Sequence, residues 1–397
     1  MELKNKKIMI LGAGKYQTPL INKAKEMNLE VHVCSISGNY PGIPFASFFH
    51  EVDISVPKKI LALAKKLDID GIITTATDVC LESIGLVVEK LNLSGTNHTN
   101  SIACLNKSKM KERFFKNDVP TPKYSTCEEI EHVIHFFNNS ESHCVLKPVD
   151  SSGSRGVHKV ENINDIEFAF LEAQKFSKSK NIIIEEWVEG EEFGAQVVVL
   201  DNKVVMLILH SDLTTPPPHR IPIAHGCPHY NERELLSPVT ECITKAINSL
   251  GINNTICNVD LILTDEGPQI IEVTSRMGGT YLPEICGNYW GIDMYKLAIE
   301  ISLGIKPIIP IRPTGKTNAA HKLIINRLGT ISKYGQMSDK YSWDLWFKEG
   351  DGLPSGNNFR EIGYVQVFGT DPARVLNEAS NAAKLFQDTS TISGDNQ

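Results

Sequence analysis

The sequence lacks long apolar runs and any excess of basic residues, and both absences exclude classes of protein. No segment reaches the roughly 18 consecutive apolar residues that a membrane-spanning helix requires, and the early run IMIL at positions 8–11 is too short for a signal-peptide core. The net charge is −7, whereas proteins that grip nucleic acid present a basic face to the phosphates. We expect neither a membrane nor a nucleic acid as a partner.

Paired cysteine motifs are also missing. The nine cysteines are an odd number and are scattered along the chain without a CxxC pair, which argues against a disulfide framework and against a zinc ribbon. The pattern predicts reduced thiols in a cytoplasmic protein.

The length and the order of apolar runs indicate several domains. A chain of 397 residues exceeds the size at which one hydrophobic core usually stops growing. Residues 7–100 alternate strand-like runs such as KIMIL and EVHVC with amphipathic helical stretches, which is typical of a Rossmann-like parallel sheet. We therefore predict a multidomain α/β and α+β fold, with domains at residues 1–100, 101–310 and 311–397, the last being a small α+β domain with a disordered tail.

A glycine motif follows the first strand-like run. In Gly12-Ala-Gly14-Lys-Tyr-Gln17 a helix N-terminus could receive an anion. The GxGxxG fingerprint of dinucleotide-binding sites is incomplete, because Gln17 stands at the position of the third glycine. This argues against a nicotinamide-dependent oxidoreductase and favours a tight turn that closes a sheet.

Two carboxylates flank a predicted hairpin within the segment CNVDLILTDEGPQIIEVTSR, residues 257–276. A strand rises about 3.3 Å per residue and reverses at such a turn, so Asp260 and Glu272 can finish side by side on paired strands. Mg²⁺ prefers a few carboxylates together with substrate phosphates, and Arg276 could reach the same anion. The alternative is an ordinary edge hairpin with solvated acids.

A small-residue loop follows the strand that carries Lys147. Backbone N–H groups of such a loop can approach phosphate oxygens, while the lysine supplies a point charge. The Walker A spacing is absent, and a flexible connector is the alternative. The acidic stretch 185–192 could hold an adenine or be a solvated turn. The loop consists of Ser151, Ser152, Gly153, Ser154, Arg155 and Gly156.

The segment 212–230 is rich in proline and histidine. This composition predicts an irregular loop, and long loops of this kind often bind ligands. We interpret His219, His225 and His229 as polar loop residues, because the spacing around Cys227 is too tight for one tetrahedral zinc. The hypothesis that this loop selects the substrate would be refuted if exchanging the loop left the substrate preference unchanged.

In their order along the chain, these motifs resemble the ATP-grasp superfamily. The resemblance covers about residues 1–310 and implies a two-lobe fold with a lid at about residues 118–185, with ATP and Mg²⁺ as cofactors. The motifs that carry the resemblance are Asn106-Lys107, the LKP strand with Lys147, the SSGSRGV loop, the EEWVEGEE stretch, and the segment from Asp260 through Glu272 to Arg276.

The resemblance also implies a role for each motif residue. Lys107 and Lys147 contact the ATP phosphates under the closing loop, and Arg276 stabilises an acyl phosphate. Asp260 and Glu272 bind Mg²⁺, but Thr274 replaces an asparagine that many members have, which leaves the second metal open. The nucleotide residues are completed by Glu185, Trp187 and Val188 at the adenine and Glu192 at the ribose.

The stretches around His225 and after Arg276, together with residues 315–385, look like the amino-acid ligases of that superfamily. This implies that Gly278, Gly279 and His225 lie at the substrate. The implied activity is ATP-dependent joining of an amino acid or small carboxylic acid to an amine. The alternatives are a carboxylase-like enzyme of purine biosynthesis, which activates bicarbonate on an aminoimidazole ribonucleotide, and a nucleotide-binding regulator without catalysis. Expected partners are small-molecule carboxylates and amines, and a homodimer is a candidate assembly.

Overall fold

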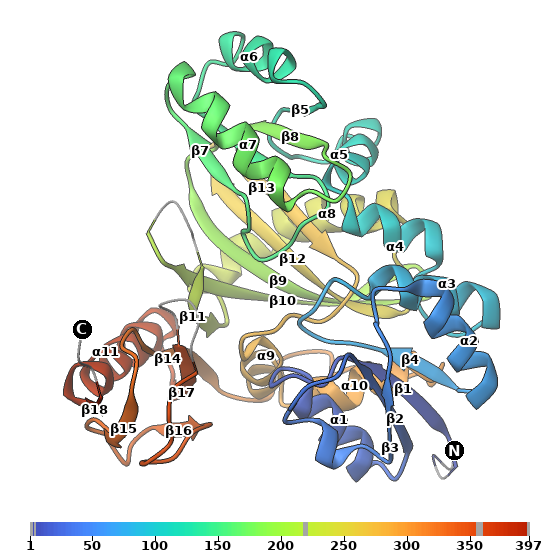
Figure 1. Ribbon diagram of the computed structural model, residues 1–397, viewed down its shortest axis with the longest axis vertical. Coiled ribbons are helices and arrows are strands. Elements are labelled where there is room, and N and C mark those ends of the chain that lie inside the picture. Colours follow the sequence, from blue (N-terminus) through green and yellow to red (C-terminus); the bar gives the residue numbers. More distant parts are fainter. Residues whose placement is uncertain (1–2, 4, 217–220, 355–359, 395–397) are drawn as a thin grey trace.

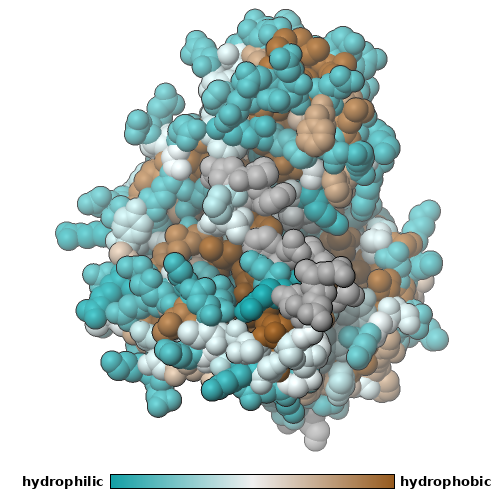
Figure 2. Space-filling model, turned by 60° about the vertical axis from the view of Figure 1, so that its left-hand side comes forward, coloured by the Kyte–Doolittle hydropathy of each residue, from teal (hydrophilic) through white to brown (hydrophobic). Residues whose placement is uncertain are grey.

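The protein is described by a computed structural model that covers residues 3, 5–216, 221–354 and 360–394. Figure 1 shows a parallel sheet with its helices at the lower right, a small lobe with α6 and α7 at the top, and a large sheet between them that continues into the C-terminal region at the lower left. Within the described ranges, no helix is long and apolar enough to cross a membrane. Hydrophilic side chains cover most of the face seen in Figure 2.

The first sheet is parallel, with the strand order β3-β2-β1-β4, as the alternating pattern predicts. Helix α1 covers one of its faces together with α10, and α2 and α3 cover the other. Helix α10 begins at Met294, far along the sequence from this sheet. The helices within residues 1–100 therefore do not by themselves cover both faces of the sheet. The elements are β1 (Lys7–Leu11), α1 (Thr18–Glu26), β2 (Glu30–Ser35), β3 (Phe48–Glu51), α2 (Pro57–Leu67), β4 (Gly71–Ile73), α3 (Leu81–Leu91) and α10 (Met294–Ser302).

The large sheet is antiparallel, with the order β13-β12-β9-β10-β11-β14-β17-β16. Helices α4, α5 and α8 pack on the face of its first half, and α9 packs with α10 on the other face. The strands are β9 (Glu191–Leu200), β10 (Lys203–Thr214), β11 (Pro222–Cys227), β12 (Thr255–Thr264), β13 (Gly267–Thr274), β14 (Thr317–Ile325), β16 (Ser342–Leu345) and β17 (Arg360–Gly369). The helices are α4 (His98–Leu105), α5 (Lys107–Lys116), α8 (Glu232–Leu250) and α9 (Leu282–Trp290).

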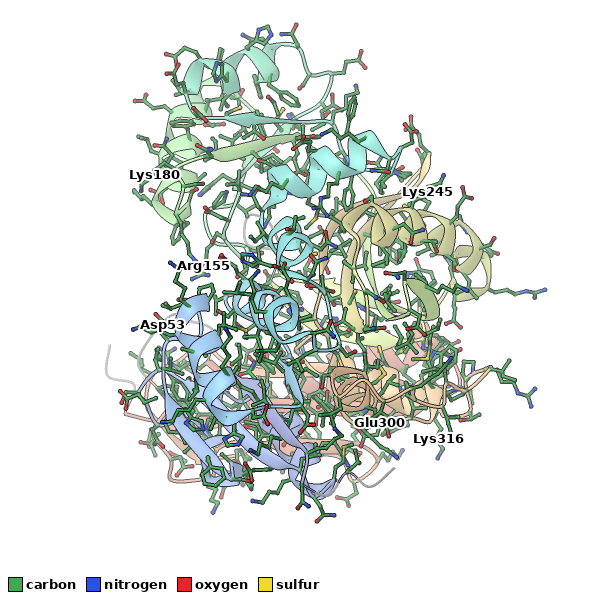
Figure 3. All side chains as sticks on the ribbon, turned by 90° about the vertical axis from the view of Figure 1, so that its right-hand side faces the viewer. Asp53, Arg155, Lys180, Lys245, Glu300 and Lys316 are labelled. Atoms are coloured by element: carbon green, nitrogen blue, oxygen red, sulfur yellow. The ribbon has the colours of Figure 1, made fainter. Side chains whose placement is uncertain are left out.

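The upper lobe is a sheet of order β5-β8-β6-β7 with α6 and α7 on one face. Because side chains alternate along a strand, Leu146 and Ile184 face these helices, while Val145, Lys147 and Glu185 face the large sheet across a cleft. The elements are β5 (Tyr124–Cys127), α6 (Ile130–Asn138), β6 (Cys144–Pro148), β7 (His158–Val160), α7 (Ile166–Phe176) and β8 (Ile182–Glu186). Figure 3 labels Arg155 at the lower edge of this lobe.

The prediction of an irregular loop at 212–230 is wrong for much of this segment. Strand β10 continues to Thr214, and Pro222–Cys227 forms β11, which pairs with β10 and β14. The prolines do not prevent this, because Pro222 opens the strand and Pro228 follows it, where a missing N–H is tolerated. His219 lies outside the described residues.

The C-terminal region also differs from its prediction. Strands β14, β17 and β16 extend the large sheet through β11, and α11 (Pro372–Thr389) packs against them. The expected disorder of the last dozen residues is wrong for their described part, because β18 (Thr391–Ser393) pairs with β15 (Thr330–Lys333). Residues 395–397 lie outside the described range. The division into three domains at the stated boundaries stays a prediction.

Candidate active site

The cleft between the upper lobe and the large sheet has a volume of about 250 Å³ and brings together most of the sequence-predicted site residues. Gly156, Arg276, Gly278, Gly279 and His225 lie outside its lining. The predicted residues that line it are Lys107, Lys147, Ser151, Ser152, Gly153, Ser154, Arg155, Glu185, Trp187, Val188, Glu192, Asp260 and Glu272.

The two hairpin carboxylates form one row across the large sheet. Asp260 on β12 is the direct partner of Glu272 on β13, which confirms the predicted pairing. On its other side Asp260 opposes Gly194 of β9, which in turn opposes His210 of β10. A Cβ atom at position 194 would lie 2.3 Å from His210 Cε1. Gly194 therefore lets an imidazole lie over the sheet next to the carboxylate pair.

Lys107 ties the carboxylate row to the small-residue loop. It is the first residue of α5, after the N-cap Asn106, whose side chain accepts from the Lys109 N–H. Lys107 Nζ donates to Glu272 Oε1 at 3.0 Å and to the carbonyl oxygen of Ser151 at 2.9 Å. Burial alone would lower the pKa of Lys107, but Glu272 outweighs it and raises the pKa. A positive charge is thus held at the floor of the cleft.

A second buried charge cluster lies on the upper lobe, and sequence reasoning found only part of it. Lys147 Nζ donates to Glu185 Oε2 at 3.1 Å, and Lys111 Nζ lies 3.4 Å from the same oxygen. Burial lowers the pKa of Lys111 to about 8, even though the Glu185 carboxylate opposes this shift. Lys111 stands one helical turn after Lys107, and this i, i+4 spacing on one helix face was the signal available in the sequence.

The small-residue loop has the positive φ angles that its glycine-rich composition suggests. Gly153, Ser154 and Gly156 have positive φ angles of 69°, 55° and 72°. A Cβ at Gly156 would lie 2.9 Å from Phe176, whereas nothing lies within 4 Å of one at Gly153. Glycine is therefore needed at 156 for packing, and Gly153 leaves open space in the cleft.

The carboxylate row fits a divalent cation. Asp260 is exposed to the cleft, but desolvation by the surrounding protein atoms and the neighbouring Glu272 charge raise its pKa to about 7. Adjacent carboxylate oxygens facing a cleft are the donors that Mg²⁺ prefers. Asp260 and Glu272 are the residues that would hold such an ion, and the ion would neutralise phosphate charge there.

The sequence has no asparagine at position 274, but an asparagine lies beside it on the neighbouring strand β12. Asn258 is the direct partner of Thr274, and its Nδ2 donates to Asp260 Oδ1 at 2.8 Å. Asn258 Oδ1 accepts from Gln196 Nε2 at 2.6 Å, and Gln196 Oε1 accepts from the Gly278 N–H at 2.8 Å. A chain of hydrogen bonds thus runs from the carboxylate row to the loop after Arg276.

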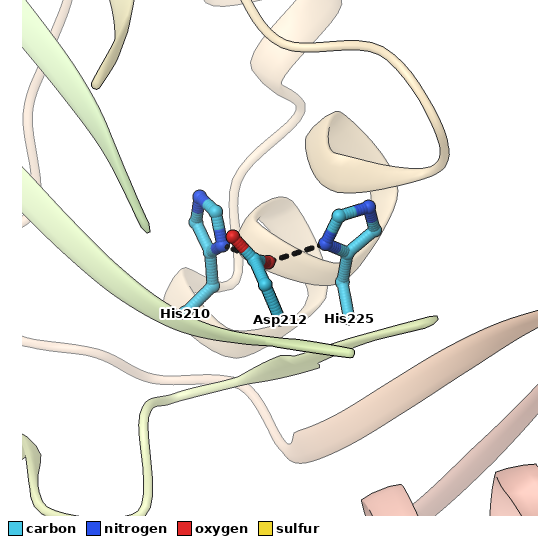
Figure 4. A group of neighbouring side chains, drawn as sticks. All are labelled: His210, Asp212 and His225. Atoms are coloured by element: carbon cyan, nitrogen blue, oxygen red, sulfur yellow. Dashed lines mark hydrogen bonds and ion pairs between the residues drawn. The ribbon is translucent and has the colours of Figure 1, made fainter. Parts of the chain in front are cut away.

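His225 connects the cleft to that loop by a second route, which begins at Asp212 between two imidazoles (Figure 4). Asp212 Oδ1 accepts from His210 Nδ1 at 2.8 Å and from His225 Nδ1 at 2.5 Å. Burial would raise the pKa of Asp212, yet the two imidazoles hold it well below its usual range. Three potential metal ligands meet here, but the N···O distances are those of hydrogen bonds, and one carboxylate satisfies both rings. Sequence reasoning missed His210 and Asp212, because their partner strand β11 was interpreted as a loop.

Arg276 lies beside the carboxylate row but contacts the N-terminal sheet region. Its Nε donates to Asp78 Oδ1 at 2.8 Å, and Nη2 lies 2.7 Å from the same oxygen. The next residues are held in unusual conformations, with φ angles of 53° at Thr280 and 69° at Tyr281. Non-glycine residues adopt such angles mainly where surrounding contacts impose them, often at functional sites. His225 Nε2, 2.8 Å from Thr280 Oγ1, is one such contact.

The glycine turn of the N-terminal sheet is closed by its own glutamine. Gln17 Oε1 accepts from the Gly14 N–H at 3.0 Å, and Gln17 Nε2 donates to the Thr75 carbonyl at 2.6 Å. The N–H group that a phosphate would need is therefore occupied. This supports the interpretation as a closed turn rather than as a dinucleotide site.

Comparison with known proteins agrees with this geometry. Residues 104–280 match the model of the ATP-grasp domain. Carnosine synthase 1 of Homo sapiens is 20% identical over 79% of the chain and 42% of its own length, and the chain spans about half the length of the curated relatives it matches first.

Two solved structures share the whole fold. A phosphoribosylglycinamide synthetase from Anaerococcus prevotii is 26% identical with a TM-score of 0.80, covering 98% of this chain and 99% of that chain. An L-amino acid ligase from Bacillus licheniformis is 20% identical, also with a TM-score of 0.80, covering 99% of this chain and 100% of that chain. These matches and the cleft between the upper lobe and the large sheet identify residues 104–280 as an ATP-grasp domain.

Proposed function

We propose that the protein is an ATP-dependent carboxylate-amine ligase that joins an amino acid or small carboxylic acid to an amine and releases ADP and phosphate. The observation that carries the proposal is the cleft in which Lys147 of the upper lobe faces the paired carboxylates of Asp260 and Glu272, with Lys107 beside Glu272 at its floor. Two cations and a candidate metal-binding pair around one cleft suit a triphosphate, because phosphoryl transfer depends on positioning and charge neutralisation.

The proposed reaction has two steps. The substrate carboxylate attacks the γ-phosphorus of ATP, giving an acyl phosphate and ADP. The amine, once its ammonium form has lost a proton to solvent, attacks the carbonyl carbon; phosphate leaves with the C–O bonding electrons, and the new amide nitrogen loses a second proton. Lys107 and Lys147 neutralise phosphate oxygens, and Arg276 acts on the acyl phosphate. Closure of the upper lobe excludes water, which would otherwise hydrolyse the mixed anhydride. Bound Mg²⁺ would add charge neutralisation at the phosphates. The roles of these residues, a cytoplasmic location and a homodimer stay proposals.

Bicarbonate activation for an aminoimidazole ribonucleotide is the second candidate, because two structural neighbours are named N5-carboxyaminoimidazole ribonucleotide synthetase. A ribonucleotide acceptor needs a cationic site for its phosphate beside the acyl phosphate. The described residues next to the loop after Arg276 include Glu284, Asp344 and Glu361, whereas the one lysine among them, Lys15, is already paired with Glu361 at 2.7 Å. This charge distribution favours the amine ligase.

The test is an assay of ADP and phosphate release with a panel of amino acids and other amines, with a parallel arm of bicarbonate plus aminoimidazole ribonucleotide. A carboxylic acid labelled with ¹⁸O in its carboxylate transfers one labelled oxygen to the released phosphate if an acyl phosphate forms. Turnover in the bicarbonate arm alone would replace the first candidate by the second. Tight ATP binding without turnover across both arms would indicate a regulator instead.

A further inference from the structure

A second cleft opens beside the loop that follows Arg276. Its volume is about 1160 Å³, and its walls come from the glycine turn, from residues 279–284 and from the region of β16 and β17. Thr280 belongs to its lining and contacts His225, whose other nitrogen contacts Asp212 in the nucleotide cleft. One imidazole therefore links a lining residue of the first cleft to a lining residue of the second.

Aromatic rings form much of the wall of this second cleft. Tyr281 stacks on Tyr364 with ring centroids 4.4 Å apart, and Tyr16 meets the edge of Trp346 at 6.3 Å. Lys15 Nζ lies 4.2 Å from the Trp346 ring centroid, a distance at which a cation is attracted to the face of an indole. The wall already holds one cation in this way and offers further half-buried ring surface.

Two carboxylates in the cleft have unused acceptor capacity. Asp344 Oδ2 accepts from Tyr281 OH at 3.2 Å and from Trp346 Nε1 at 3.1 Å, while its Oδ1 makes no hydrogen bond to a described residue. Glu284 Oε1 accepts from Tyr295 OH at 2.7 Å, and its buried Oε2 has no partner in the described part of the chain. Burial, followed by Asp344 and Glu284, raises the pKa of Tyr281, so both acids lie around the same ring.

We propose that the second cleft binds the acceptor as a positively charged amine without a phosphate group, with its ammonium against Asp344 and Glu284 and its apolar body against the rings of Tyr16, Tyr281 and Trp346. This rests on the proposed ligase function and names the class of its amine substrate. A phosphorylated acceptor is disfavoured because the described lining offers its phosphate no unpaired cation, Lys15 being paired with Glu361. The closed glycine turn then serves as a wall of the acceptor cleft rather than as a nucleotide site.

The test measures binding without nucleotide, by calorimetry and by the fluorescence of Trp343 and Trp346, with three matched probes. Tyramine carries an ammonium, tyrosol carries a hydroxyl in its place, and O-phosphotyramine adds a phosphate; cadaverine is an aliphatic cation. We expect tyramine to bind about tenfold tighter than tyrosol, because only the ammonium donates a charge-assisted hydrogen bond, and tighter than O-phosphotyramine, because the described lining offers that phosphate no unpaired cation. Asp344→Asn and Glu284→Gln are each expected to weaken tyramine binding about tenfold, whereas the exposed control Asp339→Asn leaves it unchanged.

Several results would overturn the proposal. They are absence of binding by both tyramine and cadaverine at millimolar concentration, equal binding of tyramine and tyrosol, or unchanged binding in both carboxylate variants. The ligase function fails separately, since it requires ADP formation with an acid and an amine. Ligation of a phosphorylated amine only, with Asp344→Asn unaffected, would remove the acceptor site and leave the ligase.

Discussion

His225 Nδ1 lies 2.5 Å from Asp212 Oδ1, and Nε2 of the same ring lies 2.8 Å from Thr280 Oγ1. Asp212 lines the cleft below the upper lobe, and Thr280 lines the second cleft. Because Asp212 accepts from Nδ1–H, Nε2 is the acceptor for the Thr280 hydroxyl. The imidazole thus holds the strained loop at a fixed position relative to the carboxylate row.

This link makes the first prediction. In His225→Asn the amide takes the Nδ1 position and can still donate to Asp212, but the contact with Thr280 is lost. We expect kcat to fall about tenfold, by the loss of one positioning hydrogen bond, with the KM for ATP little changed. Thr280→Val removes the same contact from the other end, so the double variant should resemble either single variant. Additive losses would show that the two residues act independently.

Arg276 makes the second prediction. Its planar guanidinium bonds Asp78 through Nε and Nη2, and a lysine in its place would offer an acyl phosphate only a point charge. We expect Arg276→Lys to lower kcat by about 10²-fold or more, in the range found when a group that stabilises transition-state charge is removed. Asp78→Asn should retain most of the turnover, because the arginine itself remains. A large loss in Asp78→Asn with normal turnover in Arg276→Lys would assign the pair to structure alone.

The buried Lys111 leads to a prediction about how stability depends on pH. Its pKa is about 8 in the folded protein against an ordinary 10.5, so between these values the unfolded chain binds more protons than the folded one. The free energy of unfolding therefore contains a component that rises with pH from about 8 to 10.5. In Lys111→Met this component should be absent, and urea unfolding of both proteins at pH 7.5, 8.5 and 9.5 measures the difference. A constant difference across that range would mean that Lys111 titrates normally.

The sequence was most informative where local signals suffice. The turn TDEGP between two apolar runs is enough to set the β12–β13 hairpin, and the pairing of Asp260 with Glu272 follows from strand periodicity. The same is true of α2 (Pro57–Leu67), one of the expected amphipathic helices, because its apolar face and its first proline are both local features.

Contacts between distant segments could not be predicted in this way. Strand β11 forms because β10 and β14 supply partners on both sides, and nothing within IPIAHGC specifies those partners. The pairing of Asp212 with His225 and of Arg276 with Asp78 depends on the same kind of tertiary arrangement. Prolines near β11 and the absence of a visible partner pointed to a loop instead. Because these contacts were not predicted, the connection between the two clefts was not predicted either.

Glu272 makes the last prediction. The carboxylate is half-buried and pairs with Lys107, so Glu272→Gln removes a candidate metal ligand and leaves Lys107 without its charge partner. We expect ADP formation to fall by about 10²–10³-fold and stability to fall by about 1–3 kcal/mol. The exposed hairpin residue Glu266 provides the control Glu266→Gln, which should change neither quantity. Near-normal turnover in Glu272→Gln would refute the metal assignment.

The most direct measurement is a crystal structure of the protein with Mg²⁺ and a non-hydrolysable ATP analogue. We expect the triphosphate between the upper lobe and the large sheet, with Lys107 Nζ and Lys147 Nζ about 3 Å from phosphate oxygens and the ion bound by Asp260 and Glu272. An empty cleft at saturating nucleotide, or a nucleotide bound at the glycine turn of the N-terminal sheet, would contradict this.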